Sequence, residues 1–294
     1  EERPAPSASV EPVVNDFSIQ VATVNGSGSQ TANLVLLRAI FQMGVPVSAR
    51  NMFPSNIAGL PTWFTIRTNK DGYIGWKKKT EVLVAMNPET AREDTLNLDA
   101  DSMVVYDESL KLDSVRSDLV FYPVPFDRLV AEVTRDVKMR RRIRNMIYDG
   151  VLSRLLGVDL DQMEIALRKQ FGNKVKVVAL NRQALDVGYA FAEQHLEKRD
   201  PYRIESMDEN GGRILIDGNA AAAIGCMMAG VTVVAWYPIT PSSSPTITSP
   251  GRRYSKRSGN CRCSRTPVSR CMTRRRDESR GSMGVCAISS EGRS

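Results

Sequence analysis

Short apolar runs alternate with amphipathic stretches over the first 124 residues. Strands are predicted where the runs are rich in residues that favour β-structure or are apolar without interruption. These are residues 17–24, 45–48, 63–68, 82–86, 103–106 and 119–122. Residues 30–43 place apolar side chains on one broad face, which predicts a helix that ends at Gly44. A second helix is predicted to begin at Asn87-Pro88-Glu89, because proline is favoured in a first turn. Strands that alternate with helices indicate an α/β fold with a largely parallel sheet.

Helical periodicity replaces the strands beyond Pro125. Amphipathic helices are predicted over residues 138–156, 160–171 and 175–196, and polar residues up to Gly211-Gly212 are interpreted as a linker. A second unit then starts with a short strand at 214–216 and a helix over 220–229, capped by Asp217 or Asn219. A buried strand is predicted at 231–236.

Both ends of the chain lack this periodicity. Residues 1–15 are rich in acidic residues, proline and serine, and residues 250–294 are rich in arginine, serine and cysteine. Neither segment can bury enough apolar surface to offset its chain entropy, so both are predicted to be disordered. The predicted organisation is therefore a tail (1–15), a Rossmann-like domain (16–205), the beginning of a second α/β domain (206–249) and a basic tail (250–294).

The final segment differs so abruptly from the body that we hypothesise a frameshifted translation. It contains twelve of the Lys and Arg residues and only three Asp or Glu, so the net charge of +7 becomes about −2 for the body. It also holds four of the five cysteines, at spacings that fit no zinc or iron–sulfur motif. We therefore predict no metal site. The absence of an apolar signal segment or membrane span favours a cytoplasmic protein.

Several features have structural interpretations that compete with functional ones. The basic run over residues 138–144 is interpreted as the solvated face of a helix in preference to a partner patch. The arginine-rich tail would bind nucleic acid only non-specifically. His195, the only histidine, lies near a helix end, where a cation is favourable. With one histidine in the chain, hydrolase triads and histidine-ligated metal sites are nearly excluded, so a cofactor or another chain must supply any chemistry.

A glycine-containing loop, Gly26-x-Gly28-x-x-Thr31, joins the first long strand to the first helix. Such glycines let backbone N–H groups approach an anion at a helix N-terminus, so Gly26 and Gly28 are a candidate anion-binding loop. The third glycine of the dinucleotide fingerprint is absent, and no acidic residue ends the next strand. A tight turn for strand–helix packing is therefore favoured over NAD binding.

The most specific motif is Tyr237-Pro238-Ile239-Thr240-Pro241-Ser242-Ser243-Ser244, which follows the predicted strand at 231–236. Its hydroxyls can donate hydrogen bonds to carboxylate or carbonyl oxygens. One short helix earlier stands Gly218-Asn219-Ala220-Ala221-Ala222-Ala223-Ile224-Gly225. This pair of elements resembles the thiamine-site region of 2-oxoacid:ferredoxin oxidoreductase alpha subunits. Residues 51–62 also resemble a loop of that family's gamma domain, although Ala58-Gly59-Leu60-Pro61 lacks its usual arginine.

The resemblance implies a gamma domain fused to the start of the pyrimidine-binding alpha domain, an order similar to that of 2-oxoglutarate:ferredoxin oxidoreductase. Such an enzyme converts a 2-oxoacid, coenzyme A and oxidised ferredoxin to acyl-CoA, CO₂ and reduced ferredoxin. Thiamine diphosphate with Mg²⁺ and an iron–sulfur cluster would be held mainly by a beta subunit. By the same resemblance Tyr237, Pro238, Ile239, Thr240 and Ser242 would line the 2-oxoacid and thiamine pocket.

The chain departs from this family after the Tyr237–Ser244 loop. The glutamate that activates thiamine in the family has no counterpart here, because Glu278 and Glu291 lie in no matching context. We therefore expect a truncated or frameshifted chain that is inactive alone, and with a beta subunit as well. The sequence does not distinguish 2-oxoglutarate from pyruvate or branched-chain 2-oxoacids as the substrate. The alternatives are a non-catalytic nucleotide-binding or scaffold protein built on the gamma-like domain, and a nucleic-acid-binding protein acting through its tail.

Overall fold

The structure is a computed structural model that describes residues 11–54, 57–230 and 285–288. It divides after Gly211 into two compact units, which are described separately. The predicted strand at 231–236 and almost all of the predicted basic tail lie outside the described residues.

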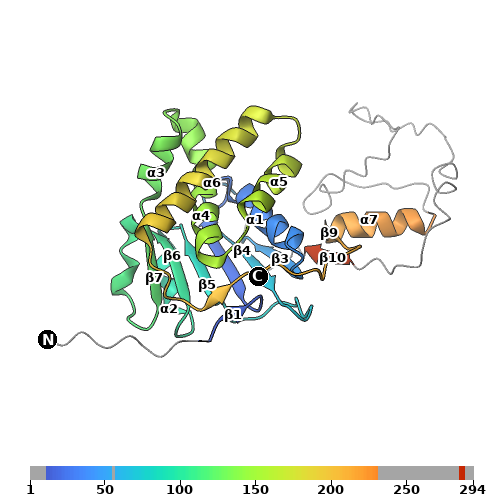
Figure 1. The fold of residues 1–294 in the computed structure, drawn as a ribbon, viewed down its shortest axis with the longest axis horizontal. Coiled ribbons are helices and arrows are strands. Elements are labelled where there is room, and N and C mark those ends of the chain that lie inside the picture. The colour runs from blue at the N-terminus through green and yellow to red at the C-terminus, as the bar shows by residue number, and fades with distance from the viewer. Residues whose placement is uncertain (1–10, 55–56, 231–284, 289–294) are drawn as a thin grey trace. The chain divides into compact units, whose positions relative to one another are not determined.

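The first unit is built on a six-stranded sheet (Figure 1). Three neighbouring pairs run parallel: β2 with β5, β5 with β6, and β6 with β7. Of the two remaining strands, β4 runs antiparallel to both β2 and β3. The predicted α/β fold with a mostly parallel sheet is confirmed. The strand order is β3 (Val47–Met52), β4 (Pro61–Thr68), β2 (Ser18–Val24), β5 (Val82–Ala85), β6 (Met103–Asp107) and β7 (Val120–Val124).

Residues at the centre of the sheet explain why its strands form. All four residues of β5 are 0% exposed, and so are Met103, Val104 and Val105 of β6. Uninterrupted apolar runs of this kind are typical of parallel strands covered on both faces. The alternation of strand and helix does not extend to the two connections that flank β4. A hairpin joins β3 to β4, and β4 continues to β5 without a helix.

Helices cover the sheet. Figure 1 shows α4 and α6 crossing side by side, with α1 and α5 next to them. The periodicity located α1, α4, α5 and α6 to within a residue or two. Helix α3 was covered only by the general helical prediction beyond Pro125, and α2 begins at Ala91 and not at Asn87. The Oδ1 of Asn87 accepts a hydrogen bond from the backbone N–H of Glu89, so a side-chain-stabilised turn precedes that helix. The helices are α1 (Ser29–Gln42), α2 (Ala91–Leu96), α3 (Phe126–Val133), α4 (Val137–Leu156), α5 (Leu160–Phe171) and α6 (Val175–His195).

Residues interpreted as a linker lie against the first unit. The buried carboxylate of Asp200 accepts hydrogen bonds from the Tyr122 hydroxyl at 2.7 Å and from the Lys198 ammonium at 2.9 Å. The Asn210 Nδ2 donates to the carbonyls of Phe41 and Val45 at the end of α1. The stretch from Asp200 to Asn210 is therefore part of the folded unit.

The same stretch pairs with the start of the chain. Strand β8 (Tyr202–Arg203) runs parallel to β1 (Val13–Val14). Among the described residues, regular structure thus begins at Val13, inside the range predicted to be a tail. Residues 1–10 of that tail lie outside the described residues.

The second unit contains β9 (Ile214–Asp217) and α7 (Gly218–Met228), and β9 pairs with β10 (Val285–Ile288). Of the two predicted caps, Asp217 takes the role, because its Oδ1 accepts a hydrogen bond from the Ala220 N–H at 2.8 Å. Strand β10 lies within the range predicted to be disordered. Among the described residues, no helix is long and apolar enough to cross a membrane.

Candidate functional site

The strand order places a topological switch point between the carboxyl ends of β2 and β5. The chain leaves β2 through α1 toward β3 and β4, and it later adds β5, β6 and β7 on the other side of β2. Open α/β sheets bind ligands where the strand order reverses in this way. Ala22 pairs with Ala85, so Asn87 lies level with Val24 at the entrance to the loop that contains Gly26 and Gly28.

The glycine loop packs against the hairpin connection that follows β3. The N–H of Asn25 donates to the Leu60 carbonyl at 2.8 Å, and the N–H of Gly59 donates back to the Asn25 carbonyl at 3.0 Å. A Cβ on Gly26 would lie 3.4 Å from the methyl group of Ala58. The two loops that the sequence singled out are therefore neighbours in space.

Helix α4 covers the other side of the glycine loop. Gly28 has a φ of +88°, and a Cβ there would lie 3.3 Å from the Arg142 carbonyl oxygen. The Asn145 Nδ2 donates a hydrogen bond to the Ser27 carbonyl at 2.8 Å. Close packing against the backbone of α4 thus accounts for the glycine at position 28. The anion-binding role of Gly26 and Gly28 stays a prediction.

Asn87, which follows β5 at this switch point, is a residue that the sequence reasoning missed as a functional candidate. It is 1% exposed, and its Nδ2 has no hydrogen-bond partner among the described residues. The Ser27 hydroxyl in the glycine loop is likewise without a partner in the described part of the chain. Two unused donors beside the start of α1 suit a ligand that presents oxygen acceptors or an anion. The available signal was a polar residue placed directly after a wholly apolar strand.

The basic run on α4 divides into two groups. Arg144 forms ion pairs with Asp107, at the end of β6, and with Asp127 of α3, and its guanidinium lies 5.5 Å from the Phe126 ring centre. Arg140 donates to the Thr134 carbonyl at 2.7 Å. The interpretation as a wholly solvated face was wrong for these two arginines, because both have partners within the unit. The side chains of Lys138, Arg141 and Arg142 are exposed.

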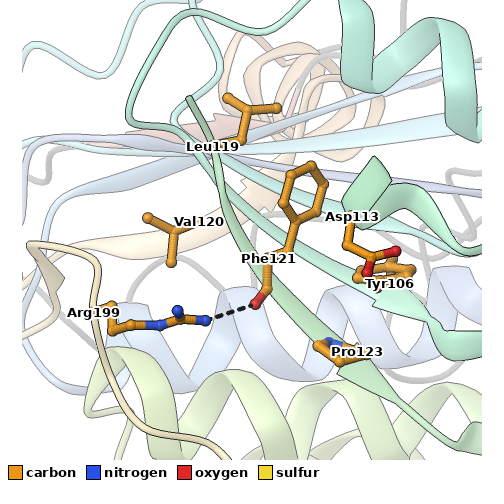
Figure 2. A pocket seen from close by; sticks show the side chains of 7 residues that line it. All are labelled: Tyr106, Asp113, Leu119, Val120, Phe121, Pro123 and Arg199. Atoms are coloured by element: carbon orange, nitrogen blue, oxygen red, sulfur yellow. Dashed lines mark hydrogen bonds between the residues drawn. The ribbon is translucent and has the colours of Figure 1, made fainter. Parts of the chain in front are cut away.

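A separate hollow of about 410 Å³ lies at the β6–β7 edge of the sheet, three strands from β2 (Figure 2). Figure 2 shows Arg199 reaching the Phe121 carbonyl, to which its Nη2 donates at 3.4 Å. Burial, followed by the charge of Asp113, raises the pKa of Tyr106 to about 12, so this phenol stays protonated at neutral pH. The hollow does not include the glycine loop or Asn87.

The other sequence-based candidates have different outcomes. Tyr237, Pro238, Ile239, Thr240 and Ser242 lie outside the described residues. His195 stands at the last position of α6, where its ring stacks on Phe191 at 4.8 Å. The described ranges contain no group of three or more His, Cys, Asp or Glu that could hold a metal ion.

Residues 18–191, more than half of the chain, match the profile of the family described as "Pyruvate ferredoxin/flavodoxin oxidoreductase". The chain belongs to this family. The α/β unit that contains the glycine loop is therefore an oxidoreductase-family domain, as the resemblance predicted.

Several relatives of this oxidoreductase-family chain are named as alpha subunits. The 2-oxoacid:ferredoxin oxidoreductase 1 subunit alpha of Sulfurisphaera tokodaii is 21% identical over 266 residues, which cover 77% of this chain and 41% of that protein. The 2-oxoglutarate oxidoreductase subunit KorA of Mycobacterium tuberculosis is 28% identical over 190 residues, covering 56% of this chain and 29% of that protein.

A solved structure is also similar to the chain. The 2-oxoglutarate:ferredoxin oxidoreductase of Magnetococcus marinus, which has 2-oxoglutarate, coenzyme A and succinyl-CoA bound, aligns with a TM-score of 0.70 and 26% identity. The alignment covers 78% of this chain and 40% of that one. Both the Sulfurisphaera tokodaii and the Magnetococcus marinus matches include most of this chain. The chain nevertheless spans only about two fifths of the length of each of those two proteins.

The packing around Gly28 gives a stability prediction. Replacing Gly28 with alanine adds two costs, the strain of a positive φ and a close contact with the α4 backbone. We expect a loss of roughly 2–3 kcal/mol in the free energy of unfolding. Gly72→Ala is the matched control, since Gly72 has a φ of +84° and an added methyl group there would have no heavy atom within 4 Å. In urea denaturation, equal losses for the two variants would contradict the packing role.

Proposed function

We propose that this chain is part of the alpha subunit of a 2-oxoglutarate:ferredoxin oxidoreductase. The family match over residues 18–191 is the principal support. The choice of 2-oxoglutarate is supported by the domain order inferred from the sequence and by two similar proteins whose names contain that acid. Pyruvate is the competing substrate, because the family description names it.

The proposed reaction joins a 2-oxoacid to coenzyme A with loss of CO₂, and two electrons pass to ferredoxin. Thiamine diphosphate supplies the electron sink, and we assign it, its Mg²⁺ and the iron–sulfur cluster mainly to a partner beta subunit. Within this chain, Tyr237, Pro238, Ile239, Thr240 and Ser242 are proposed to line the 2-oxoacid side of the pocket. The Thr240 hydroxyl would donate a hydrogen bond to an oxygen of the acid.

The glycine loop at Gly26 and Gly28 is proposed as an anion-binding site of the same enzyme. The unused donors of Ser27 and Asn87 support this role. Coenzyme A and thiamine diphosphate are the two molecules in the proposed reaction that contain phosphate. Thiamine diphosphate is assigned to the beta subunit. Coenzyme A is therefore the ligand to test here. A non-catalytic scaffold is not favoured, because the matching family and its named relatives are oxidoreductases.

The substrate assignment can be tested on the protein isolated from its own cells through an N-terminal tag, together with the subunits that accompany it. Ferredoxin reduction is measured with coenzyme A and, in turn, 2-oxoglutarate, pyruvate and 2-oxoisovalerate. The sequence predicts no turnover by the chain alone or with a beta subunit only. With the full set of subunits from its own cells, we expect the highest kcat/KM with 2-oxoglutarate. Preference for pyruvate would overturn the choice of substrate, and no reduction of ferredoxin by the full set with any 2-oxoacid would overturn the proposed function.

A further inference from the structure

The connection between β4 and β5 exposes two aromatic side chains among lysines. Tyr73 is 78% exposed and Trp76 is 56% exposed. Four lysines, Lys70, Lys77, Lys78 and Lys79, are exposed on the same connection. We call residues 69–79 the aromatic–lysine loop. Since β4 ends where β2 begins, this loop lies at the edge of the sheet opposite the glycine loop.

Specific hydrogen bonds hold the aromatic–lysine loop in one conformation. The Asn69 Oδ1 accepts from the backbone N–H groups of Asp71 at 3.0 Å and Tyr73 at 2.8 Å. The Ser48 hydroxyl donates to the Ile74 carbonyl, and the Arg50 guanidinium lies 5.4 Å from the centre of the Trp76 ring. A preformed loop loses little conformational entropy on binding, so its exposed aromatic surface is available at low cost.

The charges around the loop favour one kind of partner. Lys77 pairs with Asp16 at 3.6 Å and Lys79 pairs with Asp99 at 3.9 Å, and Asp71 is exposed within the loop. These carboxylates give the loop a surface of mixed charge, which suits the mixed surface of an acidic protein better than the uniform charge of a nucleic acid or an anionic bilayer. The cores of permanent subunit interfaces are depleted in lysine. A small apolar patch bordered by lysines suits a transient contact with an acidic protein surface.

We propose that the aromatic–lysine loop is a docking surface for an acidic protein that binds reversibly. This inference rests on the proposed function, in which ferredoxin is the partner that must bind and leave in every catalytic cycle, and it assigns ferredoxin to the loop. The contact recruits ferredoxin electrostatically, and the aromatic pair supplies its short-range apolar component. The site of electron transfer is a separate surface, because the cluster is assigned to the beta subunit.

The test measures ferredoxin binding to the chain purified with its partner subunits, by calorimetric titration at low and high salt. Lys70→Glu with Lys78→Glu reverses two lysines for which no ion pair is found among the described residues. Tyr73→Ser removes the more exposed of the two aromatic rings in the loop and leaves the backbone hydrogen bond to Asn69 in place. We expect each variant to raise the Kd about tenfold at low salt, and the effect of the charge reversal to shrink at high salt.

The matched control is Lys174→Glu with Lys176→Glu, an equal charge change at exposed positions near the start of α6. Unchanged ferredoxin affinity in the loop variants would overturn the proposal. An equal loss of ferredoxin affinity in the control variant would also overturn it. So would binding of anionic vesicles or single-stranded DNA, in place of ferredoxin, that depends on the loop residues. Turnover is recorded separately. Loss of ferredoxin binding in a complex that oxidises no 2-oxoacid would support the docking surface while refuting the proposed function.

Discussion

Replacing Gly150 with alanine is expected to lower the free energy of unfolding by about 3–4 kcal/mol, at the upper end of what overpacking costs. A Cβ on Gly150 of α4 would lie 2.1 Å from the Leu185 carbonyl oxygen and 2.8 Å from the Tyr189 nitrogen, both in the backbone of α6. Backbone atoms cannot move aside as a side chain could. The two longest helices would therefore have to separate along their whole contact. Thermal denaturation followed by circular dichroism should show a Tm lower by on the order of 10 °C.

Gly188, the glycine that α6 contributes to the same helix contact, provides a second test. A Cβ on Gly188 of α6 would lie 2.2 Å from the Ile147 carbonyl oxygen of α4. Because either methyl group separates the same helices, the double variant should lose less stability than the two single losses added together. Gly225→Ala in α7 is the control, since no heavy atom lies within 4 Å of its new methyl group. Alanine should be neutral or slightly favourable there, and a Gly150→Ala protein as stable as the wild type would refute the close crossing.

Replacing Asp149 with asparagine is expected to stabilise the protein increasingly as the pH rises above about 4. Asp149 is 0% exposed within α4, and neither of its carboxylate oxygens has a hydrogen-bond partner among the described residues. Burial raises the pKa of this carboxyl well above its ordinary value of 3.8. The folded protein thus keeps a proton that the unfolded chain releases above that value.

The direction of the pH dependence follows from proton binding. Where the folded state binds one more proton than the unfolded state, the free energy of unfolding falls by about 1.4 kcal/mol for each pH unit. The fall begins near the ordinary pKa and ends at the raised folded-state pKa. Asparagine cannot release a proton, so the gap between Asp149→Asn and the wild type should widen across this window. Asp71→Asn, at an exposed position, serves as the control.

Urea denaturation at pH 5, 6, 7 and 8 would measure the effect of Asp149. As the pH rises, the free energies of unfolding of the wild type and of Asp71→Asn should fall by equal amounts relative to that of Asp149→Asn. Parallel pH profiles for all three proteins would contradict a buried, protonated carboxyl.

The sequence predicted those parts of the fold that depend on local periodicity. Helix α4 was expected over residues 138–156 and spans 137–156, and α6 was expected over 175–196 and spans 175–195. The antiparallel direction of β4 was not predicted, because strand direction depends on which strands pair and not on the apolar pattern of one strand. The start of α2 was misplaced because residues 88–90 form a turn, in which the Asn87 Oδ1 accepts from the backbone N–H of Glu89.

The candidate site was predicted only in outline. The glycine pattern located the loop at Gly26 and Gly28, whereas its contacts with Ala58 and with the α4 backbone are between residues distant in sequence. Asp149 escaped notice because charged residues are usually exposed, and composition does not reveal a buried exception. The Tyr237–Ser244 motif, which suggested the family, lies outside the described residues, and the family match at 18–191 supports the assignment independently.

Complex formation with a partner tests the central claim most directly. The chain, expressed with the beta subunit from the same genome, can be isolated through a tag on one protein, and the mass of the eluted species can be measured by light scattering. If this chain belongs to an oxidoreductase alpha subunit, both polypeptides should elute together in a fixed ratio. Two folded proteins that elute separately at micromolar concentrations would contradict the account.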